Sequence, residues 1–301
     1  MTRRLMASGW INGFLGVLIF SFSLPATRIA VASLDPIFLT CARAAIAGLL
    51  GLLLLLALGA KRPQRKHILP LALVAGGGVI GFPLLTALAL QHETSAHAMV
   101  FVGLLPIATA IFAVWRGAER PRPAFWLCSG AGSLLIAAYA SAASGYGGAR
   151  GADGLMLAAI LVCGLAYAEG ATLSRSLGGW QVISWALVIS LPIMLPLAII
   201  LRPPHLSTIP AQAWWSLAYV SVFSMLIGFV FWYRGLAQGG IAGVGQLQLL
   251  QPFLGLGLAA FILHEPIPGS IFVMAGAVML CAGLARRFAS PKLPALSPAP
   301  P

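Results

Sequence analysis

Charged residues are scarce in this sequence. They make up 8% of its 301 residues, whereas about a quarter of the residues in a soluble globular domain are charged. This is too little charge to cover a water-facing surface, so a soluble globular fold is excluded. Hydrophobic residues account for 60% of the chain, and the mean hydropathy is +0.97. At about 30 residues per crossing and turn, the chain has room for about ten membrane spans.

Residues used in redox, metal and nucleotide sites are also few. The cysteines stand singly in apolar runs without Cys-x-x-Cys spacing, so we expect small core residues at these four positions: Cys41, Cys128, Cys163 and Cys281. None of the three lysines follows the glycine-rich pattern of a phosphate-binding loop: Lys61, Lys66 and Lys292. Direct coupling to ATP is therefore excluded.

The acidic residues form no protease or prenyl-synthase motif. His92 and His97 are one position further apart than the histidines of His-Glu-x-x-His, so they leave the shared helix face, and no metal site is expected. The only two aspartates, Asp35 and Asp153, are expected in loops, which leaves no paired-aspartate motif. A membrane hydrolase with serine and histidine is not excluded by composition, but no serine motif stands out.

The apolar runs predict an all-α membrane protein with ten transmembrane helices. Spanning segments must hydrogen-bond internally, and runs rich in Leu, Ala and Gly without strict alternation favour helices over barrel strands. The expected spans cover residues 10–32, 36–58, 68–90, 95–115, 124–143, 154–174, 181–201, 213–234, 241–263 and 267–285. No other stretch is long enough for a soluble domain, and residues 290–301 are expected to form a disordered proline-rich tail.

Basic residues predict the orientation of the chain. With an N-terminus inside, the cytoplasmic side collects Arg3, Arg4, Lys61, Arg62, Arg65, Lys66, Arg116, Arg120, Arg122, Arg175, Arg234, Arg286, Arg287 and Lys292. The other side receives only Arg150 and Arg202. We therefore expect both termini in the cytoplasm, and the net charge of +12 needs no nucleic-acid partner. This assumes an uncleaved first span; a signal peptide cleaved after Ala32 would leave nine spans, but Arg28 stands close to that cut.

An internal repeat has a constant offset. Four residues recur 146 positions later: Leu90, Ala96, Pro106 and Glu119 as Leu236, Ala242, Pro252 and Glu265. The offset predicts two five-helix halves, residues 1–147 and 148–289, followed by the tail. Because five is odd, the second half enters the membrane from the opposite side. Inverted halves of this kind can open a midplane site to each side in turn.

These repeated residues also resemble a family. The motifs Leu90-Gln-His-Glu-Thr-Ser-Ala96, Leu105-Pro106 and Glu119-Arg120-Pro121, with their partners Leu236-Ala-Gln-Gly-Gly-Ile-Ala242, Gln251-Pro252 and His264-Glu265-Pro266, resemble the repeat unit of EamA-type transporters. These transporters belong to the drug/metabolite transporter superfamily. The resemblance implies a bacterial inner-membrane exporter of amino acids, including aromatic ones, or of other small metabolites. It also implies a cavity lined by spans 1, 3, 4, 6, 8 and 9, with spans 5 and 10 set aside as scaffold.

Charged side chains inside spans are candidates for the site, because they cost free energy in hydrocarbon. Glu169 is the only carboxylate well inside a span, and it is a candidate for binding a proton or a substrate ammonium. Alternatively, it pairs with Arg175 or reaches the interface. Arg28 and Arg43 are candidates for a substrate carboxylate, although arginines near span ends commonly extend to the interface.

Polar and aromatic residues complete the candidate site. His97, with Phe101 one turn further, is expected either to line or gate the cavity or to have a structural role. The amides of Gln246, Gln248 and Gln251 in span 9 are expected either to bind a polar substrate or to join helices by hydrogen bonds. Candidate aromatic wall residues are Tyr167, Trp185, Phe101 and Trp232. Candidate hinges are Pro106 and Pro252, with a further kink at Pro25.

Taken together, the sequence predicts a secondary transporter that exports a small metabolite, an amino acid above all, by alternating access. The alternative is a membrane-embedded lipid-handling protein or enzyme. We expect no catalytic residues, no cofactor and no metal. The expected partners are a small-molecule substrate and membrane lipid.

Overall fold

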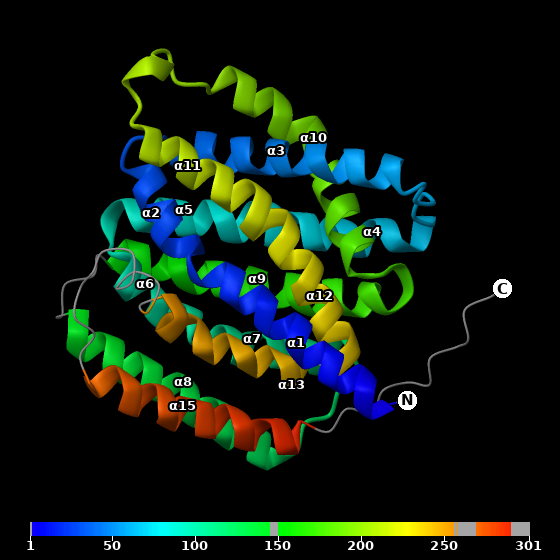
Figure 1. The fold of residues 1–301 in the computed structure, drawn as a ribbon, viewed down its shortest axis with the longest axis vertical. Helices are drawn as coiled ribbons and strands as arrows, with labels where there is room; N and C mark the ends of the chain where they lie inside the picture. The colour runs from blue at the N-terminus through cyan, green and yellow to red at the C-terminus, as the bar shows by residue number, and fades with distance from the viewer. Residues whose placement is uncertain (1, 145–149, 256, 258–268, 290–301) are drawn as a thin grey trace.

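The computed structural model describes residues 2–144, 150–255, 257 and 269–289, and every regular element in these ranges is helical (Figure 1). The α-helices are α1 (Thr2–Ser21), α2 (Ser23–Val31), α3 (Pro36–Ala57), α4 (Arg65–Val74), α5 (Phe82–His92), α6 (Ser95–Val102), α7 (Leu105–Arg116), α8 (Pro123–Ser144), α9 (Arg150–Leu177), α10 (Gly179–Ile200), α11 (Ala211–Tyr219), α12 (Gly228–Gly239), α13 (Ile241–Gly245) and α15 (Gly269–Phe288). Two π-helical segments, η1 (Ala75–Gly81) and η3 (Val220–Ile227), and two 3₁₀ segments, η2 (Leu206–Thr208) and η4 (Gln246–Leu250), interrupt or connect them.

Six helical stretches in the described residues are long and apolar enough to cross a membrane: Ala7–Val31, Pro36–Ala57, Arg65–His92, Gly151–Leu177, Gly179–Ile200 and Ala211–Gly239. Each coincides with an expected span. The expected span 95–115 is divided between α6 and α7, while α8 and α15 stand where spans 5 and 10 were expected. Part of the expected span 241–263 lies outside the described residues, so the total of ten stays a prediction.

Prolines follow several of the interruptions. Pro25 lies in the first turn of α2, directly after the break at Phe22, and Pro106 is the second residue of α7. Pro252 follows the 3₁₀ segment η4. A proline is tolerated in the first turn of a helix, because its missing N–H would have no partner there. The three prolines singled out as hinges or kinks thus stand where the helices are already broken.

Helix boundaries recur with the offset of the sequence repeat. α4 begins at residue 65 and α11 at 211, α5 at 82 and α12 at 228, and α6 at 95 and α13 at 241, each 146 positions apart. The π-helical segments begin at residues 75 and 220, almost the same displacement. The irregular features of the first half therefore recur in the second.

Glycines allow α1 and α12 to cross closely. A Cβ added at Gly235 of α12 would lie 2.5 Å from the backbone nitrogen of Gly13, and one added at Gly9 would lie 2.7 Å from that of Gly239. Such separations are far below a van der Waals contact, so α1 and α12 meet backbone to backbone, as small residues permit in membrane helices.

α8 and α15 pack along each other at one edge of the bundle (Figure 1). These are the segments that the family resemblance sets aside as scaffold. α9, by contrast, runs through the middle of the molecule and contacts α5, α7, α10 and α12. One expectation is corrected here: Asp153 is not a loop residue, because α9 already begins at Arg150 and places Asp153 in its first turn.

Candidate functional site

A small cavity lies at the centre of the bundle. It is lined by Phe20, Ser23, Leu24, Arg43, Gly78, Phe82, Pro83, Leu105, Tyr167, Ser224, Phe229 and Gln251. All six spans implied by the family resemblance contribute to it, and α3 adds Arg43. The cavity volume, taken as the space open to the centre of a water molecule, is about 20 Å³. That is room for about one water molecule, so this conformation is closed to anything of amino-acid size.

One wall of the cavity is polar. Arg43 is only 4% exposed, and its Nη2 lies 3.5 Å from Oγ of Ser224. That hydroxyl is in turn 2.7 Å from Oγ of Ser23. Nε of Arg43 is buried without an acceptor, and no carboxylate in the described part of the chain pairs with the guanidinium. A buried cation without a counter-charge costs several kcal/mol, so this wall is suited to receive an anion.

Aromatic rings also line the cavity. The ring of Phe229 lies edge-on to those of Phe20 and Tyr167, with centroids 5.2 and 5.8 Å away. Trp232, fully buried, packs edge-on against Tyr167 at 5.4 Å. Edge-to-face contacts of this kind hold the rings in fixed orientations and give the cavity an apolar part beside its polar one.

Three predicted site residues line this cavity: Arg43, Tyr167 and Gln251. Nε2 of Gln251 donates to the carbonyl of Phe20 at 3.3 Å. Gln246 and Gln248 are fully buried nearby but do not line the cavity in this conformation. Neither amide atom of Gln248 has a hydrogen-bond partner in the described residues.

Trp185 also lies apart from the cavity wall. It is half-buried on α10, and its Nε1 has no acceptor among the residues that the structure describes.

Glu169 does not line the cavity either. It is two residues beyond Tyr167 on α9, about 200° further around the helix, and therefore faces another way. Its carboxylate is buried and pairs with Nε of Arg116 on α7. The expected partner, Arg175, instead donates from Nη2 to Oε1 of Glu119 at 3.1 Å.

Glu119 is the centre of contacts at this end of α9. Besides Arg175, it accepts hydrogen bonds from the backbone nitrogens of Ile241 at 2.7 Å and Ala242 at 2.9 Å. Both are at the start of α13, where the first N–H groups have no partner within the helix. The ion pairs Arg116–Glu169 and Arg175–Glu119 thus join α7 and the loop after it to α9. The backbone hydrogen bonds to Glu119 join the same loop to α13.

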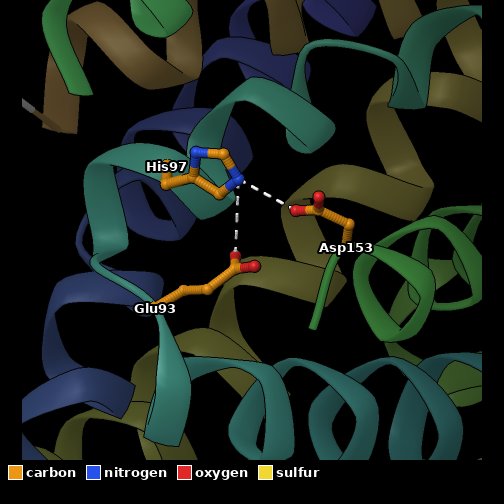
Figure 2. Close-up of side chains that lie close together, drawn as sticks. All are labelled: Glu93, His97 and Asp153. Atoms are coloured by element: carbon orange, nitrogen blue, oxygen red, sulfur yellow. Dashed lines mark hydrogen bonds and ion pairs between the residues drawn. The ribbon is translucent and has the colours of Figure 1, made fainter. Parts of the chain in front are cut away.

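A second charged cluster lies at the opposite end of α9 (Figure 2). Nε2 of His97 is 2.9 Å from Oδ1 of Asp153 and 3.8 Å from Oε2 of Glu93. Burial raises the pKa of Glu93 to about 7. The His97 ring contacts Phe101 edge-on at 5.8 Å, and neither residue lines the cavity.

Arg28 also lies outside the cavity wall, and Nη1 of Arg28 donates to the carbonyl of Leu90 near the end of α5.

Sequence reasoning missed two features of these sites. Ser23 and Ser224 meet across 201 positions, and nothing in their apolar surroundings marks them in the sequence. Asp153 meets His97 across 56 positions, and only the packing of α9 beside the end of α5 brings them together. Arg43, in contrast, was recognisable in the sequence as a candidate site residue, because it is a charged residue within an apolar run.

Comparison with known proteins gives consistent matches. The model of the EamA-like transporter family matches the chain twice, over residues 7–141 and 150–286. The chain is 64% identical over 282 residues to the uncharacterized transporter YdeK of Bacillus subtilis, covering 94% of this chain and 98% of the relative. It is 24% identical over 269 residues to a probable terminal-alkyne amino-acid exporter of Streptantibioticus cattleyicolor, covering 88% of each. A protein of known crystal structure, 20% identical, has the same fold, with a TM-score of 0.74 over 94% of this chain and 99% of the other.

Proposed function

Because the chain belongs to the EamA-like transporter family, we propose that it exports amino acids across a bacterial plasma membrane by alternating access. The family and the names of the relatives indicate a transporter rather than an enzyme. The substrate class rests on the cavity. The exporter from Streptantibioticus cattleyicolor supports the choice more weakly, because it is a distant relative.

The buried guanidinium of Arg43 is the observation that carries the proposal. It faces a central cavity and pairs with no carboxylate in the described part of the chain. A substrate carboxylate would supply the missing charge through charge-assisted hydrogen bonds, which are stronger than neutral ones. The hydroxyls of Ser23 and Ser224 would accept hydrogen bonds from the substrate ammonium or donate to its carboxylate.

The aromatic wall suits the rest of such a substrate. Phe20, Tyr167 and Phe229 line the same cavity as Arg43, and they would bury an apolar or aromatic side chain. A cavity with one charged wall and one aromatic wall selects an amphipathic carboxylate over an inorganic anion.

Alternating access follows from the closed cavity and from the proposed repeat. The cavity must widen to admit an amino acid, and clusters at both ends of α9 hold the two family-matched segments together. We take these segments as inverted halves: the helix boundaries that recur 146 positions apart support the repeat, and the five spans expected in each half would invert the second. With the positive-inside orientation, the Arg116–Glu169 and Arg175–Glu119 pairs close the cytoplasmic side, and the Glu93 cluster closes the outer side.

Counterflow in proteoliposomes tests the proposal. Wild-type protein is expected to give saturable exchange of a labelled L-amino acid. Arg43→Gln is expected to lower the rate at subsaturating substrate by at least tenfold, since a lost charge-assisted hydrogen bond costs about 1.5–3 kcal/mol. Arg202→Gln, at an exposed position in the loop after α10, serves as the matched control and should exchange like the wild type. Equal rates for Arg43→Gln and Arg202→Gln would contradict the role of Arg43.

A further inference from the structure

The charged cluster at the N-terminal end of α9 brings together three side chains of types that bind metals. One ligand atom each from Glu93, His97 and Asp153 lies within 4.8 Å of the other two (Figure 2). Glu93 caps the end of α5, His97 lies one turn later in α6, and Asp153 comes from the first turn of α9. All three side chains point toward one spot, around Nε2 of His97.

The burial of Glu93 is a second and independent observation. Its side chain is 1% exposed, and neither carboxylate oxygen receives a hydrogen bond from any donor in the described residues. Among the described residues, the positively chargeable atom paired with it is Nε2 of His97, 3.8 Å away and already hydrogen-bonded to Asp153. A buried carboxylate without such bonds is costly, so a cation beside it would be strongly stabilised.

We propose that Glu93, His97 and Asp153 bind a divalent transition-metal ion, with Zn²⁺ as the best match. One imidazole nitrogen and two carboxylate oxygens form a ligand set that Zn²⁺ accepts, and a water would complete the tetrahedron. Ligand atoms about 2.0–2.2 Å from Zn²⁺ in a tetrahedron lie about 3.4 Å apart. The separations of 2.9 Å and 3.8 Å from Nε2 of His97 lie on either side of this value, so small side-chain rotations suffice.

The position of the site gives the ion a structural consequence. Glu93 and His97 belong to the first family-matched segment and Asp153 to the second. An ion bound to all three would tie the two segments together at one end of the bundle. Asp153 is 40% exposed, which leaves a path for the ion from solvent. The ion would therefore hold this end closed, and its binding is separate from substrate binding at Arg43.

Zinc titration of the purified, chelator-treated full-length protein in detergent tests the site without any transport assay. Calorimetry should show saturable binding of Zn²⁺, and the melting temperature should rise with it. Glu93→Gln, His97→Gln and Asp153→Asn should each weaken binding at least tenfold. The exposed histidines outside the cluster provide matched controls, and His92→Gln and His205→Gln should bind like the wild type. Melting curves without metal show whether each variant is folded.

Cobalt supplies a spectroscopic readout. Co²⁺ bound to the wild type should give the visible absorption of a tetrahedral site, and this absorption should be absent from His97→Gln. Two results would overturn the proposal: no saturable Zn²⁺ binding by the wild type, or equal binding by the cluster variants and the wild type.

Discussion

Arg43 shows how one side chain gives a cavity its chemistry. The sequence alone left it with two roles, a substrate-binding cation or an arginine extended to the interface. The structure places it 4% exposed at the centre of the bundle, among aromatic rings and two hydroxyls. The burial of its guanidinium argues against extension to the interface and supports the proposed role in binding a substrate carboxylate.

Glu169 shows the limit of reasoning from single residues. Its isolation in an apolar span marks it as functional in the sequence, yet its role depends on which way α9 faces. The structure turns Tyr167 to the cavity and Glu169 to Arg116. A sequence gives the burial of a charged residue more readily than the identity of its partner, which here comes from a helix 53 positions away.

Glu119 provides a prediction at the residue scale. Glu119→Ala removes two hydrogen bonds to the start of α13 and the pair with Arg175, and we expect it to lower the free energy of unfolding by about 2–4 kcal/mol. Arg120→Ala, at the exposed neighbouring position, should have little effect. Thermal melting of the purified variants measures both. A melting temperature for Glu119→Ala equal to that of Arg120→Ala would refute the capping role.

Helix interruptions were partly foreseen from the sequence. The prolines pointed to breaks after Phe22, between α6 and α7, and at η4. The π-helical segments η1 and η3 carry no comparable signal, although both line the cavity through Gly78 and Ser224. A π-helical segment depends on tertiary packing and is common at functional sites, which explains why local sequence does not reveal it.

Close packing of η1 against α9 gives a prediction at the scale of elements. A Cβ added at Gly77 would overlap the backbone carbonyl of Val162, whereas one added at Gly76 meets nothing within 4 Å. Gly77→Ala should therefore destabilise the protein by about 1–3 kcal/mol, because the two helices must move apart. Gly76→Ala should be nearly neutral. Melting temperatures of the two variants, differing by one position, decide the matter, and equal values would contradict the packing.

The paired prolines give a second prediction at this scale. Pro106 and Pro252 follow the breaks of the two segments where we expect movement, so Pro106→Ala combined with Pro252→Ala should slow amino-acid exchange several-fold. Pro192→Ala, at an exposed position of α10, is the control. Exchange rates in proteoliposomes provide the measurement. If the double variant exchanged as fast as Pro192→Ala, the prolines would not be hinges.

At the scale of the whole molecule, composition and repetition were the informative signals. Scarce charge predicted a membrane protein, and apolar runs placed six spans where the structure has them. The offset of 146, found from four residue pairs, also relates the starts of three pairs of helices. The inverted orientation of the two halves and the ten crossings stay predictions.

The sites at both ends of α9 were harder to predict than the fold. They join residues from the two segments, and each contact depends on how those segments dock. A repeat fixes which helices correspond, but it does not fix which side chains meet across the interface. Long-range polar contacts such as those of Glu93 and Glu119 therefore required the structure.

The recognition of a substrate carboxylate in the cavity is the central claim, and competition in a counterflow assay tests it most directly. Exchange of labelled L-phenylalanine by the wild type is challenged with unlabelled L-phenylalanine or with phenethylamine, which lacks only the carboxylate. The account predicts that the amino acid competes at least tenfold better than the amine, because only the carboxylate reaches Arg43. Equal competition by the amine, or no saturable exchange of any amino acid, would contradict it.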